Sequence, residues 1–283
     1  MKLTTVAFST SDMAQQVIFG VQDLDPDTRY RVRAIIGIDA EEVIPKFIGR
    51  GLVSGKKFYD FTMKPRDLVF RVSLNPKYAV NEDVEEIRNV IYRLISANMS
   101  GELTIIFKSD PMVLYYLKGL ITKMEVAHFD KTPELQITLR CEEPMFKSVN
   151  PLVATPEELT SANPIVVTDD LSTAPHGFNF RVKFTATTST FIIQDDPTDP
   201  DWTFEVTPAT SFQVDDELYI SSEYGVKRVF WDKDVGTDID LMDKVVIGSL
   251  WPKIFPGVNT LYFMQIANFD WVDFRFYASY WGI

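Results

Sequence analysis

The feature that most constrains the fold is a change of hydrophobic period at Asn75-Pro76. Residues 67–74 alternate between apolar and polar side chains, which is the pattern of a strand with one buried face. Beyond Pro76, aliphatic residues recur at three- and four-residue steps over about 80–97 and form one stripe of a helix. A helix with a single apolar stripe needs a sheet to pack on, so the chain from Arg66 to Phe146 predicts an α+β unit.

The predicted strands that follow this helix are 101–107, 113–126 and 135–141. Gly119 interrupts the long second strand and predicts a bulge or a bend. The length of this strand also makes it a candidate to reach a neighbouring subunit. The candidate core and assembly residues of the unit are Val84, Ile87, Ile91, Leu94, Leu103, Ile105, Tyr115, Tyr116 and Leu117.

The patterning divides the chain into two domains, and the predicted fold class is mainly β. Residues 1–148 form the first domain, in which 1–29 are interpreted as an arm or an edge strand. The interval 149–177 is rich in proline and predicts a linker. From 178 to 283, short strands about ten residues apart predict a β-sandwich. In its last strand, Phe274 and Phe276 are expected on the face opposite Trp271.

The composition excludes several classes of function. The net charge of −12 argues against binding to nucleic acid or to an anionic membrane, both of which require basic surfaces. No apolar run is long enough to span a bilayer, and the N-terminus lacks the apolar core of a signal peptide. The single cysteine, Cys141, is expected to be a buried apolar residue. We therefore expect a chain that folds in the cytoplasm.

No residue pattern indicates catalysis, a metal or a cofactor. The two histidines, His128 and His176, stand in no spacing typical of a catalytic triad or a metal site. Aspartates cluster at 195–201 and 232–243, but the second cluster lacks the glycine and the final glutamate of a calcium loop. We interpret both clusters as solvated turns and expect no enzyme activity.

Short motifs, in a fixed order, resemble the distal tail proteins of long-tailed bacteriophages. The motifs are Ile36-Gly37-Ile38-Asp39, Gly55-Lys56-Lys57-Phe58, Pro65-Arg66, Asn75-Pro76 with Ile87-Arg88, Gly101-Glu102-Leu103, Tyr115-Tyr116-Leu117-Lys118-Gly119, Leu139-Arg140-Cys141-Glu142-Glu143-Pro144-Met145-Phe146 and Phe255-Pro256-Gly257-Val258-Asn259. The similarity covers most of residues 30–148 and about the last 35 residues, and it is weak in between.

The resemblance implies a structural, non-enzymatic component of the virion tail tip. In that family the N-terminal domain forms a belt in a hexameric ring, and the C-terminal domain is similar in fold to galectins and carbohydrate-binding modules. The implied partners are further copies of the chain, the tail-tube protein, the hub or tip protein, the tape measure, and receptor-binding or side-fibre proteins. The ring would let the tape measure and DNA pass.

The main alternative is a glycan- or receptor-binding module of a virion or a cell surface. All five tryptophans fall in the predicted sandwich, where exposed rings can stack on sugars. Candidate glycan contacts are Trp202, Trp231, Trp271 and Trp281. A third hypothesis is a tube or hub subunit of a different symmetry.

Overall fold

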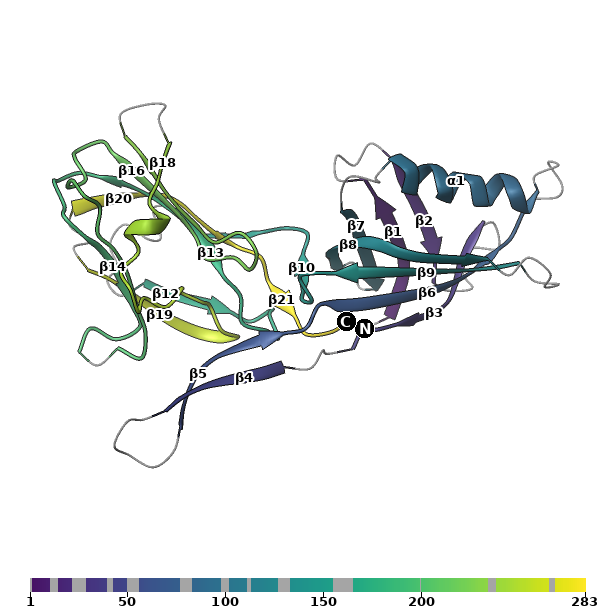
Figure 1. The fold of residues 1–283 in the computed structure, drawn as a ribbon, viewed down its shortest axis with the longest axis horizontal. Helices are drawn as coiled ribbons and strands as arrows, with labels where there is room; N and C mark the ends of the chain where they lie inside the picture. Colours follow the sequence, from purple (N-terminus) through teal and green to yellow (C-terminus); the bar gives the residue numbers. More distant parts are fainter. Residues whose placement is uncertain are drawn as a thin grey trace. The chain divides into compact units, whose positions relative to one another are not determined.

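The computed structural model describes residues 2–10, 15–21, 29–39, 43–49, 56–76, 83–97, 102–110, 113–126, 133–154, 165–198, 200–233, 238–264 and 268–283. The chain divides into two compact units. The first unit comprises Met1–Val149 with the C-terminal Tyr280–Ile283, and the second comprises Asn150–Ser279. Each unit is dominated by strands, so the predicted mainly β class is confirmed (Figure 1).

The first unit contains one described α-helix and eleven strands. These elements are β1 (Lys2–Ser9), β2 (Gln16–Gly20), β3 (Tyr30–Ile36), β4 (Val43–Gly49), β5 (Lys56–Met63), β6 (Arg66–Leu74), α1 (Val84–Ala97), β7 (Leu103–Asp110), β8 (Val113–Val126), β9 (Glu134–Cys141), β10 (Phe146–Ser148) and β21 (Ser279–Tyr280), the last of which begins at the boundary between the units. The described part of α1 starts a few residues after the predicted start near 80, and residues 77–82 lie outside the description.

Strand β8 closes the main sheet of this unit into a barrel. Its first half pairs with β7, where Leu103 lies opposite Gly119. Its second half pairs with β9, beginning with Leu120 opposite Arg140. The remaining order β7-β1-β2-β3-β6-β9 completes the circuit. The length of β8 therefore serves two partners within the chain. Its contact with a neighbouring subunit stays a prediction. The bulge predicted at Gly119 lies instead between Ile121 and Lys123.

Residues 2–9 and 16–20, within the segment predicted as an arm or an edge strand, form two central strands of the barrel. Thr5–Ser9 of β1 pair with Gln16–Gly20 of β2, and Val6, Phe8, Val17 and Phe19 are buried. The ring centroids of Phe8 and Phe19 lie 4.7 Å apart. This segment alternates over too few residues to reveal its buried face in the sequence, but it contributes two central strands.

Helix α1 packs against β2 and β6 and buries Ile87, Ile91 and Leu94 of the predicted stripe. Asp83 precedes its first turn and accepts a 2.7 Å hydrogen bond from the Glu86 amide, while the Glu86 carboxylate accepts one from the Asp83 amide. This reciprocal capping satisfies two amides that the helix leaves unpaired. The Tyr30 hydroxyl donates to the Ile87 carbonyl at 2.8 Å and ties the helix to β3. The helices in the described part of the chain are all too short or too polar to cross a bilayer.

Strands β4 and β5 form a separate two-stranded hairpin that extends from the barrel (Figure 1). Among the described residues, neither strand pairs with a strand of the barrel. An isolated hairpin is at best marginally stable in water, so this element needs a contact beyond its own hydrogen bonds.

The second unit is a sandwich of two antiparallel sheets. One sheet has the order β11-β20-β13-β16-β17-β18 and the other has the order β12-β19-β14-β15. The elements are β11 (Leu152–Ala154), β12 (Ile165–Asp169), β13 (Phe178–Phe184), β14 (Phe191–Gln194), β15 (Thr203–Val206), β16 (Glu217–Ser221), β17 (Arg228–Asp232), β18 (Asp238–Asp240), the 3-10 turn η2 (Met242–Lys244), β19 (Gly257–Phe263) and β20 (Phe269–Phe276).

The interval predicted as a linker contributes to this sandwich. Leu152 pairs with Phe276, so β11 is the edge of the larger sheet. Ile165 pairs with Leu261 and is buried, so β12 belongs to the smaller sheet. The prolines misled the prediction because they lie outside these two short strands.

Phenylalanine rings fill the space between the two sheets. Phe180, Phe184, Phe191 and Phe263 are fully buried, and their rings contact one another across the core. The alternation predicted for the last strand fails at one point, because a bulge shifts the register of β20 against β13 between Trp271 and Asp273. The bulge places Trp271 in the same core as Phe274.

Candidate functional site

Most of the predicted core and assembly residues gather in the buried core of the first unit, which α1 and the barrel strands form together. Seven of them are buried, namely Ile87, Ile91, Leu94, Leu103, Ile105, Tyr115 and Leu117. Val84 packs against the edge of the same cluster, and Tyr116 is half-buried. These side chains hold one subunit together, and a direct role in assembly stays a prediction.

Arg66 joins several of the motifs that carry the family resemblance. Its buried guanidinium donates to four backbone carbonyls, those of Gly37, Asp39, Pro144 and Trp281, over 2.5–2.6 Å. Three motifs that are distant in sequence therefore meet the C-terminal segment at one side chain. Gly37 is required there because its φ of +92° and a Cβ only 2.2 Å from the Asp67 carbonyl would exclude a side chain.

Cys141 is buried as predicted and lies beside Gly119. A Cβ at Gly119 would approach the Cys141 Sγ to 2.7 Å, so the glycine makes room for the thiol. Burial raises the pKa of Cys141 to about 12, against the opposing effect of Arg66. A thiol that stays protonated at neutral pH is a poor nucleophile, which supports a packing role.

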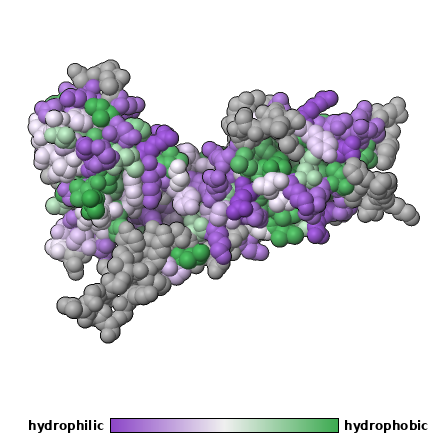
Figure 2. Space-filling view, in the orientation of Figure 1, coloured by the Kyte–Doolittle hydropathy of each residue, from purple (hydrophilic) through white to green (hydrophobic). Residues whose placement is uncertain are grey.

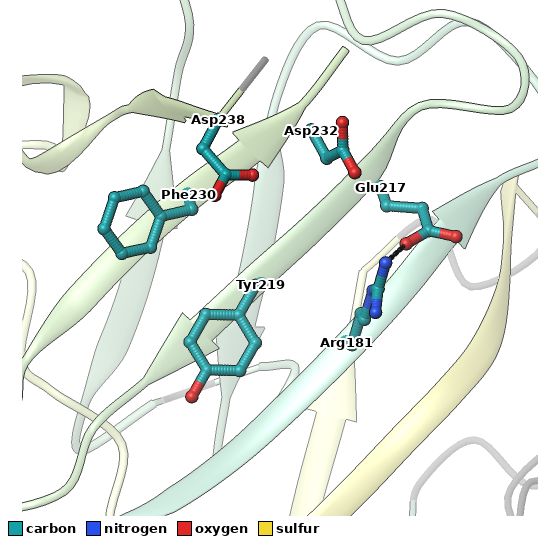
Figure 3. A pocket seen from close by; sticks show the side chains of 6 residues that line it. All are labelled: Arg181, Glu217, Tyr219, Phe230, Asp232 and Asp238. Carbon is teal, nitrogen blue, oxygen red and sulfur yellow. Dashed lines mark ion pairs between the residues drawn. The ribbon is translucent and has the colours of Figure 1, made fainter. Parts of the chain in front are cut away.

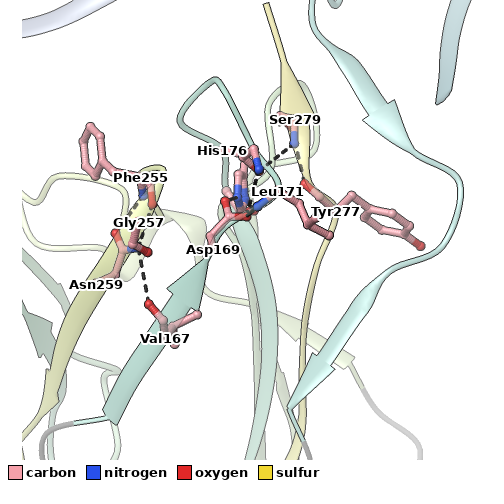
Figure 4. Close-up of polar contacts among 11 residues, drawn as sticks. Val167, Asp169, Leu171, His176, Phe255, Gly257, Asn259, Tyr277 and Ser279 are labelled. Carbon is pink, nitrogen blue, oxygen red and sulfur yellow. Dashed lines mark hydrogen bonds and ion pairs between the residues drawn. The ribbon is translucent and has the colours of Figure 1, made fainter. Parts of the chain in front are cut away.

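A buried polar network in the second unit surrounds His176 (Figure 4). The His176 Nε2 lies 2.8 Å from the Asp169 Oδ2, and the other Asp169 oxygen accepts from the Leu171 and Ser172 amides. The Ser172 hydroxyl accepts from the Ser279 amide at 2.9 Å. Burial acts to raise the pKa of Asp169, but the hydrogen bonds from His176 and Ser172 outweigh it and lower the pKa. The network joins the turn after Asp169 to Ser279, so its hydrogen bonds stabilise the fold of the second unit.

The Phe255–Asn259 motif forms a turn that Asn259 holds closed (Figure 4). The Asn259 Oδ1 accepts from the Phe255 amide at 2.7 Å, and its Nδ2 donates to the Phe255 carbonyl at 2.7 Å. Gly257 takes a φ of +98°, which the predicted type II turn requires. This motif therefore shapes a surface turn and carries no reactive group.

The tryptophans predicted as glycan contacts divide into two groups. Trp231 and Trp271 are 4% and 6% exposed within the sandwich core, so neither ring can stack on a sugar, and that prediction is wrong for both. Trp202 packs against the edge of the core and is partly exposed. Trp281 is partly exposed and belongs to the first unit, not to the sandwich.

A pocket of about 290 Å³ lies on the outer face of the larger sandwich sheet (Figure 3). Its lining residues are Arg181, Glu217, Tyr219, Phe230, Asp232 and Asp238. The two aspartates belong to the cluster interpreted as a solvated turn, but they lie on paired strands, β17 and β18. Sequence reasoning missed this face because the signal is spread over strands that are distant in the chain.

The described residues contain no group of three or more His, Cys, Asp or Glu side chains placed to hold a metal ion. His128 lies outside the described residues.

No family model and no curated protein matches this sequence. Solved structures do match along the whole chain. The SPP1 Dit (gp 19.1) protein, a paradigm of the hub adsorption apparatus in Gram-positive infecting phages, is 14% identical, with a TM-score of 0.60 over 97% of this chain and 98% of that one. This chain has the fold of SPP1 Dit. A chain from the phage P2 baseplate, in its activated conformation with Ca, is 9% identical, with a TM-score of 0.51 over 98% of both chains. The Dit fold thus accounts for the barrel unit and the sandwich unit together.

Proposed function

We propose that this chain is a structural distal tail protein of a long-tailed bacteriophage. The observation that carries the proposal is the fold match with SPP1 Dit, which extends over nearly the full length of both chains. The resemblance of the motifs that meet at Arg66 supports the same assignment from the sequence. In this role the protein is located at the tail tip of the virion, after synthesis in the host cytoplasm, and it catalyses no reaction.

The proposed assembly is a hexameric ring that joins the tail tube to the hub or tip protein. Closed rings require heterologous interfaces, in which one surface of a subunit meets a different surface of the next. The β4–β5 hairpin supports such an interface because, among the described residues, its strands pair only with each other. We propose that the hairpin lies against the neighbouring subunit, which would add a contact beyond the hydrogen bonds between its two strands.

The surface and charge of the chain are compatible with this role. Figure 2 shows apolar side chains gathered in patches on the visible face of each unit, and such patches are typical of contact surfaces. On the outer face of the smaller sandwich sheet, Val166 is 59% exposed and Val258 is 72% exposed. The net charge of −12 would repel DNA from the ring and let DNA and the tape measure pass. Receptor-binding or side-fibre proteins are the proposed partners of the exposed apolar surfaces.

Native mass spectrometry of the purified full chain tests the ring. The expected result is a species of sixfold mass, which negative-stain electron microscopy shows as an annulus. A monomer that persists at high protein concentration would contradict the proposal.

A further inference from the structure

We propose that Tyr280–Ile283 is a strap that locks the first unit. The whole second unit, Asn150–Ser279, stands in the chain between the barrel strands and this segment, which nevertheless belongs to the first unit. The barrel would therefore reach its full stability only after the second unit has been synthesised and the strap has docked. The lock depends on contacts within the first unit, so it does not rest on the ring proposal.

The backbone of the strap supplies an acceptor to the buried guanidinium of Arg66. The Arg66 Nη2 donates to the Trp281 carbonyl at 2.6 Å, whereas its Nε and Nη1 donate to three other carbonyls of this unit. Arg66 is 1% exposed, so bulk water cannot replace a lost acceptor. A buried charged group that loses a hydrogen-bond partner costs free energy. Undocking of the strap would therefore destabilise the place where the distant motifs meet.

The side chains of the strap pack beside the strand that closes the barrel. The Tyr280 ring meets the Tyr115 ring edge-on, with centroids 4.8 Å apart. Tyr115 is buried on β8, and both Tyr280 and Ile283 pack against the hydrophobic core of the first unit. Strand β21, which contains Tyr280, lies next to β10 at the end of the main sheet, and β10 pairs with β8. The strap thus adds apolar contacts and a strand to the region where the sheet closes.

The point from which the strap starts is fixed by the second unit. Ser279 is buried, and its amide donates to the Ser172 Oγ at 2.9 Å. Its carbonyl accepts from the Thr173 and Ala174 amides at 2.9 and 3.1 Å. Asp169 holds this turn, because one of its carboxylate oxygens accepts from the Ser172 amide. A segment anchored at its first residue loses less conformational entropy on docking than a free segment, so a folded second unit favours docking of the strap.

The position of the strap in the chain imposes an order of events. Synthesis reaches the barrel strands first and the strap only after the second unit. A chain that stops within the second unit would lack the Trp281 carbonyl and keep a less stable barrel. In the proposed ring, such incomplete chains would be excluded from assembly, and this consequence alone rests on the proposed function.

Hydrogen-exchange mass spectrometry on the full chain tests the lock with two substitutions in the strap. Ile283→Asp places a charge against the core, and Tyr280→Ala removes the ring that contacts Tyr115. In both variants the amides of β8 and β10 should exchange faster than in the wild type by about tenfold or more, which corresponds to about 1.4 kcal/mol. The amides of β13 and β16, in the second unit, should exchange at the wild-type rate.

The chain offers a matched control for each substitution. Ile247 is 101% exposed and Tyr224 is 42% exposed, and both lie in the second unit. Ile247→Asp and Tyr224→Ala should therefore exchange as the wild type does in both units. These controls separate undocking of the strap from the general effect of an added charge or a lost ring.

Two results would overturn the proposal. Wild-type exchange of β8 and β10 in both strap variants would show that the strap does not stabilise the first unit. Equal acceleration in the two units would show that the segment stabilises the whole chain and is no lock on the barrel. Tyr280→Ala decides the question if Ile283→Asp fails to fold, because it removes a ring contact without burying a charge. Native mass spectrometry of the wild type reports on the ring separately, since a persistent monomer contradicts the ring and leaves the exchange result unchanged.

Discussion

At the scale of single residues, Arg66 shows how short motifs that are distant in the sequence come together in the fold. Its guanidinium is buried and bonds to carbonyls up to 215 residues away in sequence. A buried charge is costly unless it is hydrogen-bonded, so the segments that supply these carbonyls must be placed together. Periodicity cannot reveal such a residue, because the partners are backbone atoms and leave no trace in the sequence.

Asp169 gives the second unit a predictable dependence on pH. Its pKa is lowered in the folded state, so the unfolded chain takes up the proton more readily. The stabilisation is therefore complete above the unfolded pKa of about 4, and it is lost as the pH falls through the folded value. We expect Asp169→Asn to be less stable than the wild type near neutral pH, with a difference that shrinks below about pH 4. Urea unfolding between pH 3 and pH 7 measures both trends.

The neighbouring residue provides the control for this experiment. Asp170 is exposed, so Asp170→Asn should unfold as the wild type does across the same range. A difference between wild type and Asp169→Asn that stays constant with pH would show that the carboxylate charge contributes nothing.

At the scale of elements, helix α1 is the clearest case of a prediction that can be tested by one side chain. Ile91 is 0% exposed against the barrel, whereas Val90, one position away, is 42% exposed. Ile91→Asp places an unpaired charge in the core and should destabilise the unit by more than about 4 kcal/mol, enough to prevent folding. Val90→Asp should cost about 1 kcal/mol or less. Circular dichroism during thermal unfolding compares the two, and soluble, cooperatively folded Ile91→Asp would show that this helix face is not in the core.

The same scale shows where sequence patterns stop being informative. Ile87, Ile91 and Leu94 on α1 and Leu103 and Ile105 on β7 are buried as predicted, because each set follows one period over enough residues. The prediction for Trp271 is wrong, because strict alternation assumes no bulge. The bulge in β20 adds one residue between Trp271 and Asp273 and turns the Trp271 side chain to the core face. The pairing of β8 with two partners is a property of barrel closure, which arises from long-range contacts.

The candidate pocket could not be predicted for a related reason. Its residues come from four strands, and Arg181 and Asp238 stand more than fifty positions apart in the chain. In the sequence Asp232 and Asp238 belonged to an acidic cluster whose simplest interpretation was a turn. Strand register, which the sequence does not specify over such distances, brings them beside Tyr219 and Arg181.

At the scale of the whole molecule, the two-stranded hairpin makes the ring proposal testable at one residue. Ile44 on β4 is 41% exposed in the single chain, and an aspartate there would be solvated unless a neighbouring subunit covers it. If the hairpin lies in the subunit interface, Ile44→Asp buries a charge on assembly and should weaken association by about 2 kcal/mol or more at each contact. The single chain should still fold, because the hairpin pairs with no barrel strand in the described part of the unit. Native mass spectrometry over a concentration series should therefore show Ile44→Asp shifted from sixfold mass toward monomer.

Val258→Asp, at a more exposed valine of the sandwich, is the control for added charge and should assemble as the wild type does. Rings of unchanged stability in Ile44→Asp would place the subunit interface elsewhere on the barrel.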